Sequence, residues 1–289
     1  MPASTDVTLS TREASTMTSV DSPDSTPLLA VRDLKVWFDR KRQEPLRAVD
    51  GLSYTVEVGR ARAIVGESGS GKTVAARAVL GLLPGTSHIV HGEIAFDGRD
   101  LRNAPVEQLR KIRGREIAMV FQNASEALNP TLTLERQLTE HLLWHRICSR
   151  REAVQRAIEA LDDVGIPEPA AKLRMYPFQL SGGMRQRAML AVATVTRPKL
   201  LIADEPTTAV DVTVQRQVLD LLQRLKDDGM AIVMITHDLG VARAFCDDVT
   251  VMYQGRQVEE GPIRQVIDSP RDPYTQRLLE STLEVGHEH

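Results

Sequence analysis

The chain has few cysteines and few aromatic residues, and it contains no long apolar run. Its 289 residues include two cysteines, Cys148 and Cys246, which are far apart and belong to no Cys-x-x-Cys pair. We therefore expect reduced thiols in a cytosolic protein rather than a disulfide framework or a zinc site. No stretch reaches the roughly eighteen uninterrupted apolar residues that a membrane span needs, so no span is expected.

A large excess of charge of one sign is also missing. The 36 basic and 39 acidic residues give a formal net charge of −3. This near balance argues against a charged surface that binds nucleic acid, but it leaves room for a nucleotide held at a local site. Hydrophobic residues make up 42% of the chain. The length suits one large α/β domain or a domain with an inserted lobe.

The N-terminal segment, residues 1–27, is rich in serine and threonine. It lacks the apolar core of a secretory signal. Because it offers too little apolar surface to offset its ordering entropy, we expect a disordered extension before a domain at 28–289.

Strand patterns and helix patterns alternate along the rest of the chain. Apolar and polar residues alternate over 28–58, which predicts two antiparallel strands. Further apolar runs predict buried strands in "RAIV", "EIAMVFQN", "KLLIAD" and "AIVMIT". Helices are predicted from about 73 to 83 and at about 212–227. Hairpins are predicted in "GEIAFDGRDL" and, at the end of the sheet, in "VTVMYQGRQVEEG". This alternation is typical of a mostly parallel, buried sheet.

Residues 131–180 interrupt the alternation with a helical pattern. Apolar residues recur at three- and four-residue spacing from Val154 to Val164, which places them on one helix face. We therefore expect a separate helical lobe at about 131–180, and a C-terminal tail at about 262–289.

A glycine-rich segment follows the strand "RAIV". Residues 66–73, "GESGSGKT", which we call the glycine loop, fit G-x-x-x-x-G-K-[ST] at every position between a strand and a helix. Glycines let successive backbone N–H groups line a concavity at a helix N-terminus, where an anion is favoured. Lys72 would reach the β- and γ-phosphates of a triphosphate, and the Thr73 hydroxyl would bind Mg²⁺. A structural glycine turn is the alternative.

Two adjacent carboxylates end the apolar run "LLIADEPT". Asp204 is placed to hold Mg²⁺ through water, and Glu205 to polarise an attacking water as general base. A third segment, "LSGGMRQR", opens a helix with a serine and two glycines, which is a second helix N-terminus able to accept an anion.

In this order, the three segments resemble the ABC ATPase family over nearly the whole chain, from about Leu28 to Leu283. The resemblance implies an α/β fold, a P-loop NTPase cassette with a RecA-like core, an N-terminal antiparallel β subdomain and an inserted α-helical lobe. It implies ATP and Mg²⁺ as ligands. It also implies that the serine and two glycines of the third segment, Ser181, Gly182 and Gly183, which we call the signature segment, close over ATP held by the glycine loop of a second subunit. Each monomer alone would then be nearly inactive.

The same resemblance assigns the remaining site residues. Gln122 in "VFQN" resembles the glutamine that touches Mg²⁺ and the lytic water, and His237 in "ITHD" resembles the switch histidine that bridges the γ-phosphate and the catalytic carboxylate. Asp211 in "TTAVD" matches an aspartate that communicates across the dimer. Phe38 resembles the aromatic residue that stacks on adenine, with Trp37 as the alternative. The expected nucleotide-binding set, including the signature segment, is Phe38, Gly66, Ser68, Gly69, Ser70, Gly71, Lys72, Thr73, Ser181, Gly182, Gly183 and Asp211, and the expected Mg²⁺ set is Thr73, Gln122 and Asp204.

Several stretches further resemble the ATP-binding subunits of peptide and nickel importers. "DPYTQRLLES" near the C-terminus is the most distinctive, beside "RGREIAMVFQ" and "ALNP". Two departures are Asn123-Ala124 in place of the Asp-Pro that often follows the glutamine, and no cysteine beyond Cys246, so no iron–sulfur cluster is expected.

The resemblance implies an importer motor on the cytoplasmic face of a bacterial membrane. Its expected partners are two permease subunits, a related second ATPase and, indirectly, an extracytoplasmic substrate-binding protein, with no nucleic acid. Di- or oligopeptides lead as cargo, and nickel or a metal chelate comes second. An exporter ATPase and a soluble ABC ATPase acting on ribosomes or DNA are the rival functions; the latter usually carries two cassettes or a long coiled-coil insert.

Overall fold

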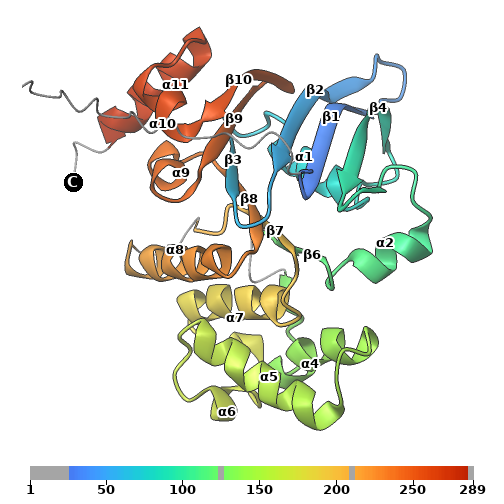
Figure 1. The fold of residues 1–289 in the computed structure, drawn as a ribbon, viewed down its shortest axis with the longest axis vertical. Coiled ribbons are helices and arrows are strands. Elements are labelled where there is room, and N and C mark those ends of the chain that lie inside the picture. The colour runs from blue at the N-terminus through green and yellow to red at the C-terminus, as the bar shows by residue number, and fades with distance from the viewer. Residues whose placement is uncertain (1–25, 123–126, 208–211, 286–289) are drawn as a thin grey trace, which may run out of the picture.

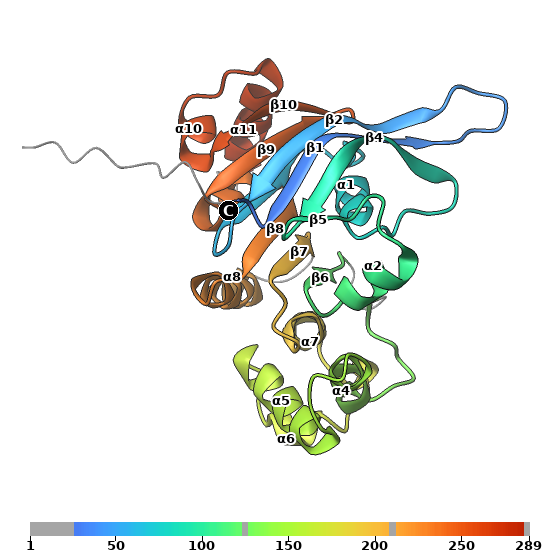
Figure 2. The ribbon, with the colours of Figure 1, turned by 45° about the vertical axis from the view of Figure 1, so that its right-hand side comes forward.

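The computed structural model describes residues 26–122, 127–207 and 212–285, which fold into two sheets and a set of helices (Figure 1). One sheet is antiparallel, the other is mostly parallel, and a group of helices lies at one end of the molecule, away from both sheets (Figures 1 and 2). Of the N-terminal extension predicted at 1–27, residues 1–25 lie outside the described part of the chain.

The antiparallel sheet has four strands in the order β2-β1-β4-β5. Its strands are β1 Leu29–Phe38, β2 Leu46–Val56, β4 Ser87–Phe96 and β5 Arg99–Asp100. The alternation over 28–58 does form two antiparallel strands, β1 and β2. The predicted hairpin at 92–101 is the end of β4 with β5, and it joins the same sheet through β1.

The second sheet has six strands in the order β10-β9-β3-β8-β7-β6. Its strands are β3 Ala61–Val65, β6 Ile117–Val120, β7 Leu200–Asp204, β8 Ala231–Thr236, β9 Asp248–Tyr253 and β10 Arg256–Pro262. All neighbours run parallel except β9 and β10. The carboxyl ends of β3, β6, β7 and β8 therefore meet at one edge, where ligands bind in open α/β sheets.

Both faces of this sheet are buried, as its apolar runs predict. In β3, Ala63 and Val65 pack on one face and Ile64 on the other, because successive side chains of a strand point to opposite sides. Helix α1 (Lys72–Val79) packs with the antiparallel sheet against one face. The helix predicted at 73–83 ends earlier, because Gly81 adopts a left-handed φ of 59° and the amide of Leu82 bonds back to the carbonyl of Arg77. Helix α2 (Val106–Ile112) adds Leu109 and Ile112 to this core.

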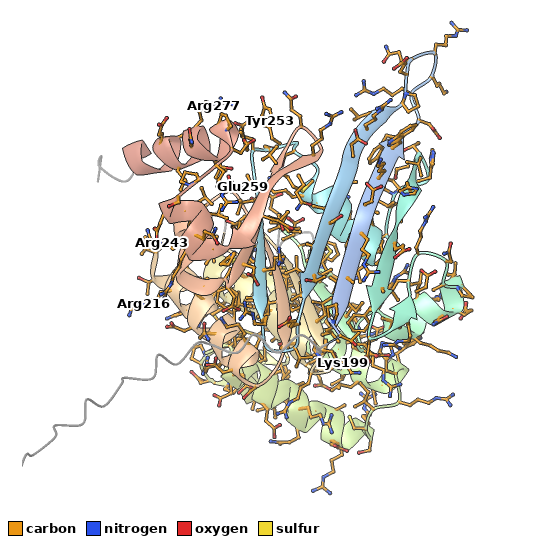
Figure 3. All side chains as sticks on the ribbon, turned by 45° about the horizontal axis from the view of Figure 1, so that its top comes forward. Lys199, Arg216, Arg243, Tyr253, Glu259 and Arg277 are labelled. Atoms are coloured by element: carbon orange, nitrogen blue, oxygen red, sulfur yellow. The ribbon has the colours of Figure 1, made fainter. Side chains whose placement is uncertain are left out.

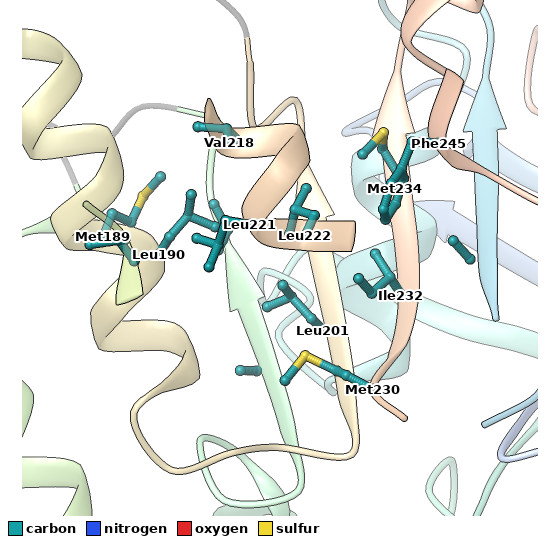
Figure 4. Packing of buried hydrophobic residues seen from close by; sticks show 14 of the residues in the cluster. Met189, Leu190, Leu201, Val218, Leu221, Leu222, Met230, Ile232, Met234 and Phe245 are labelled. Carbon is teal, nitrogen blue, oxygen red and sulfur yellow. The ribbon is translucent and has the colours of Figure 1, made fainter. Parts of the chain in front are cut away.

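The other face packs against α7 (Gly182–Thr194), α8 (Val212–Asp227) and α9 (Leu239–Phe245). Figure 4 shows Leu190 of α7 and Leu221 of α8 meeting beside the sheet, where Leu201 and Ile232 face them. Helix α8 coincides with the helix predicted at 212–227. Because α7 also contacts the helices beyond it, it connects the sheet to the helical end of the molecule.

That helical end consists of α4 (Leu134–Trp144), α5 (Arg150–Asp163), α6 (Pro169–Lys172) and a 3₁₀ turn at Pro177–Gln179. The helical pattern read over 131–164 is divided into two helices. Arg146 adopts a left-handed φ of 54°, and Ser149 starts α5 by accepting a hydrogen bond from the amide of Glu152. Ala157 and Leu161 of the predicted face are fully buried.

The chain returns to the sheets at its C-terminal end. Helices α10 (Ile263–Asp268) and α11 (Pro273–Val285) follow β10 and lie beside α9 and the edge of the six-stranded sheet (Figure 1). Within the described residues, no helix is both long and apolar enough to cross a bilayer.

Candidate active site

The glycine loop joins the carboxyl end of β3 to α1, and neighbouring backbone presses on it at two points. A Cβ atom on Gly66 would lie 2.1 Å from the carbonyl oxygen of Met252, and one on Gly71 would lie 2.2 Å from that of Ala48. Both glycines also have positive φ, 151° and 101°. Only glycine fits these positions, because the loop is wedged between the ends of β9 and β2.

The other side of the loop is open. Gly69 has a φ of 81°, and a Cβ atom there would meet nothing within 4 Å. Ser68 and Gly69 are exposed, whereas Ser70 is buried. The loop ends at the N-terminus of α1, where Gly71 supplies no side-chain cap. The first amides of α1 therefore point toward a concavity that suits an anion.

Lys72 lies folded over this loop and is 5% exposed. Its Nζ donates to the carbonyl oxygens of Gly66 and Glu67, at 2.7 Å each. Burial lowers the pKa of Lys72, and the carboxylates of Glu205, Asp204 and Glu67 oppose that shift. An ammonium group has three N–H donors, and the two carbonyls use two of them. The third has only a long contact, 3.5 Å from Nζ to the hydroxyl oxygen of Ser70, which a closer oxygen acceptor would replace.

Asp204 and Thr73 meet at the carboxyl end of β7. The Thr73 hydroxyl donates to Oδ1 of Asp204 at 3.2 Å, and Asp204 is 4% exposed. Burial raises the pKa of Asp204, the Thr73 hydrogen bond lowers it, and the adjacent Glu205 raises it. A hydroxyl and a buried carboxylate side by side form the all-oxygen donor set that Mg²⁺ prefers, so these residues fit that ion.

Glu205 lies between two polar side chains. Nε2 of Gln122 donates to its Oε2 at 2.7 Å, and Nδ1 of His237 lies 3.4 Å from its Oε1. The residue has a left-handed φ of 49°, a conformation that costs about 1 kcal/mol or more outside glycine. Such a strained bend directly after a strand is common at functional sites, and here it sets the direction of the carboxylate.

Local hydrogen bonds hold the turn that carries His237. The Thr236 hydroxyl accepts from the amide of Asp238 at 3.0 Å, and Asp238 in turn caps α9 by accepting from the amide of Val241. The turn between β8 and α9 is therefore fixed on both sides of the histidine. Gln122 follows β6 in the same way, so the ends of β6, β7 and β8 bring Gln122, Glu205 and His237 together.

The signature segment, Ser181 to Gly183, starts α7. The Ser181 hydroxyl accepts from the amide of Met184, and a Cβ atom on Gly183 would lie 2.9 Å from Val214 of α8. One turn on, the buried Gln186 donates to the carbonyl oxygen of Pro206 at 2.6 Å. That bond ties the signature helix to the turn that follows Glu205.

The structure brings some predicted residues together and leaves others apart. Lys72, Thr73, Asp204, Glu205, Gln122 and His237 form one cluster at the sheet edge. Over the described ranges, no hydrogen bond links the signature segment to the glycine loop. Asp211 lies outside the described residues.

The aromatic candidates lie at the end of β1. Phe38 pairs with Leu46, two residues before Ala48, whose carbonyl touches the glycine loop. Trp37 pairs with Arg47, whose guanidinium lies 5.0 Å from its ring centre. Both aromatic residues therefore lie on the strand pair that adjoins the loop, and the choice between them stays a prediction.

Sequence reasoning missed two residues of this region. Gln186 is part of "LSGGMRQR", where a polar residue in an otherwise apolar helix face could have signalled a buried hydrogen bond. Tyr274 of the C-terminal stretch accepts a hydrogen bond from the amide of Glu67 at 2.9 Å. A separation of 207 residues gives no local signal for that contact.

Comparisons with known proteins agree with this geometry. A family model described as "ABC transporter" matches residues 49–208. The chain is 50% identical over 256 residues to a peptidoglycan transport ATP-binding protein, YejF, of Agrobacterium fabrum, covering 88% of this chain and 46% of that protein. It therefore spans about half the length of that relative. It is 44% identical to the dipeptide transport ATP-binding protein DppD of Escherichia coli, covering 90% of this chain and 80% of that protein.

Among solved structures, a dimeric ATP-binding cassette in a post-hydrolysis state, bound to ADP and phosphate, aligns with a TM-score of 0.73. The two chains are 28% identical, and the alignment covers 82% of this chain and all but 1% of that one. The fold predicted from the motifs, an ABC cassette, is confirmed.

Proposed function

The chain belongs to the ABC transporter family, and from that membership we propose that it is the ATP-hydrolysing subunit of a bacterial importer of di- or oligopeptides. One observation carries the catalytic part of the proposal. The carboxylate of Glu205 lies between Gln122 and His237 at the same sheet edge as the glycine loop and Asp204. A base, two side chains that orient it and a phosphate cradle are the parts that hydrolysis of a nucleoside triphosphate needs.

The glycine loop binds the phosphates of ATP. Its open side and the first amides of α1 face the anion, and the remaining N–H of Lys72 donates to the β- and γ-phosphate oxygens. Thr73 and Asp204, with Gln122, would hold Mg²⁺. When bound, that ion neutralises negative charge on the phosphates.

Glu205 is the general base. Its carboxylate accepts a proton from a water molecule, whose oxygen forms a bond to the γ-phosphorus while the bond from that phosphorus to the bridging oxygen breaks and its electrons stay on ADP. Gln122 and His237 orient the carboxylate by contacting one oxygen each.

The active form is a pair of cassettes. The signature segment starts α7 with a serine and two glycines, and within one chain it makes no hydrogen bond to the glycine loop in the described ranges. We propose that Ser181, Gly182 and Gly183 contact ATP bound to a second ATPase subunit. The related cassette that was solved as a dimer with ADP and phosphate supports this arrangement.

The membrane partners contact the boundary between the sheet and the helical lobe at 131–180. A groove of about 300 Å³ lies beside Phe121, the residue before Gln122, and its wall is formed by residues of β6, α4 and α7, among them Met119, His141 and Met189. Phe121 is 38% exposed there. A permease segment in this groove would touch the residue next to Gln122, which couples docking to the site.

The chain itself lies on the cytoplasmic face of the inner membrane, held by its partners. Those partners are two permease subunits and a second ATPase, supplied with cargo by an extracytoplasmic substrate-binding protein. The printed names of its relatives, a dipeptide transport ATP-binding protein and a peptidoglycan transport ATP-binding protein, support peptides or peptide-containing molecules as cargo.

Affinity purification of the tagged chain from membranes tests this function. We expect two permeases and a second cassette to co-purify, and the reconstituted complex to hydrolyse ATP faster when a peptide-loaded binding protein is added. Lys72→Ala serves as the control, because it should abolish that stimulation without releasing the permeases. Co-purification of ribosomal proteins or DNA instead of permeases would refute the proposal. If nickel, and not peptide, stimulated ATP hydrolysis by the complex, the cargo would be nickel rather than peptides.

A further inference from the structure

The C-terminal stretch "DPYT" reaches back to the glycine loop. Tyr274, in the first turn of α11, is 4% exposed, and its hydroxyl oxygen accepts from the amide of Glu67 at 2.9 Å. Glu67 is the second residue of the glycine loop. Among the described residues, no other group accepts a hydrogen bond from the Glu67 amide.

The position of Tyr274 is fixed by its own neighbourhood. The Glu259 carboxylate of β10 accepts from the amides of Arg271 and Asp272, and Oδ1 of Asp272 accepts from the amide of Tyr274 at 2.7 Å. The ring of Tyr274 packs against that of Tyr253, with centres 4.2 Å apart. Figure 3 shows Tyr253 and Glu259 on the hairpin beside α11. Three hydrogen bonds and a ring contact thus aim one hydroxyl.

The amide N–H that donates to Tyr274 belongs to the peptide group between Gly66 and Glu67. The carbonyl oxygen of that same peptide accepts from Nζ of Lys72 at 2.7 Å. A peptide group is planar and trans, so its N–H and C=O point in opposite directions. Fixing the N–H end on Tyr274 therefore fixes the direction in which the Gly66 carbonyl faces Lys72.

The hydroxyl has a task that ring packing does not explain. A phenylalanine would fill the same space and stack on Tyr253 equally well, but it would leave the Glu67 amide without its acceptor. Burial raises the pKa of Tyr274, so the phenol stays neutral and accepts through a lone pair.

We propose that Tyr274 is a positioning residue for nucleotide binding, which acts on Lys72 through the Gly66–Glu67 peptide. By holding this peptide, Tyr274 keeps the Gly66 carbonyl on the ammonium group and leaves the third N–H of Lys72 directed at the phosphate. The inference rests on the proposed function, in which the glycine loop binds ATP. It gives the C-terminal stretch a role at the site itself.

Tyr274→Phe in the full-length chain tests the proposal, with Tyr253→Phe as the matched control. The control removes the hydroxyl of the stacked partner, which accepts from Gln254 and not from the glycine loop. Titration with a fluorescent ATP analogue should show about fivefold weaker binding for Tyr274→Phe, the effect of one buried neutral hydrogen bond, and unchanged binding for Tyr253→Phe. In the transporter complex KM should rise by the same factor with kcat nearly unchanged, because the lost contact acts equally before and in the transition state.

Hydrogen exchange at the Glu67 amide gives a second readout that needs no nucleotide. We expect this amide to be protected in the wild type and in Tyr253→Phe, and to exchange faster in Tyr274→Phe. Wild-type affinity in Tyr274→Phe, equal losses in both variants, or an unprotected Glu67 amide in the wild type would each overturn the proposal. A wild type that binds no ATP would instead refute the proposed function, so the two failures are distinguishable.

Discussion

Gly71→Ala probes the contact that shapes the glycine loop. Its new Cβ atom would lie 2.2 Å from the carbonyl oxygen of Ala48, where real contacts are not found below 3.0 Å. An alanine at a φ of 101° costs about 1–2 kcal/mol, and the displacement of β2 needed to relieve the overlap adds about 1–3 kcal/mol. For a domain of this size a total near 3 kcal/mol corresponds to a fall in Tm of roughly 6–12 °C.

Gly69→Ala is the matched control. Its φ is also positive, at 81°, but no atom lies within 4 Å of the added methyl group. Only the backbone cost of about 1–2 kcal/mol remains, which corresponds to a fall in Tm of roughly 2–8 °C. Thermal unfolding without nucleotide measures both variants. Equal falls in Tm would refute the reasoning, because the contact between the glycine loop and β2 would then contribute nothing.

Two further changes test other parts of the site. Asp204→Asn should raise Tm at pH 7 by roughly 2–4 °C if the buried carboxylate costs about 1 kcal/mol. Because burial raises the pKa of Asp204 in the fold, this cost is present above the raised pKa and is lost as the pH falls below the unfolded pKa of about 3.9, so the gain should vanish at about pH 3, and a gain that persists there would contradict the burial argument. Gln186→Met removes the hydrogen bond from α7 to the Pro206 carbonyl while keeping the volume of the side chain, and should lower the free energy of unfolding, measured by urea denaturation, by about 1–3 kcal/mol. An unchanged value would show that the bond does not stabilise the fold.

The sequence predicted those parts of the fold and site that depend on local pattern. The glycine loop, the carboxylates after β7 and the glycines that start α7 are each read from a few consecutive residues, and the strands on either side follow from apolar runs. The interruption between α4 and α5 was missed, because Arg146 gives no glycine or proline signal although it adopts a left-handed conformation.

Long-range contacts were beyond reach of the sequence for a different reason. The bond from Glu67 to Tyr274 and the bond from Gln186 to Pro206 depend on how α11 and α7 pack against the sheet. Apolar periodicity shows which face of a helix is buried, but it does not show which polar group on that face finds which partner. Both contacts became visible only with the packed structure.

Glu205→Gln in the complex with the permeases and the second cassette tests the catalytic assignment most directly. The amide keeps the shape of the carboxylate and an oxygen that can accept from Gln122, but it cannot take a proton from water. We expect ATP binding to be retained and turnover to fall by at least about 100-fold, since general base catalysis contributes about 10²–10⁴. Turnover at the wild-type rate would show that Glu205 is not the base.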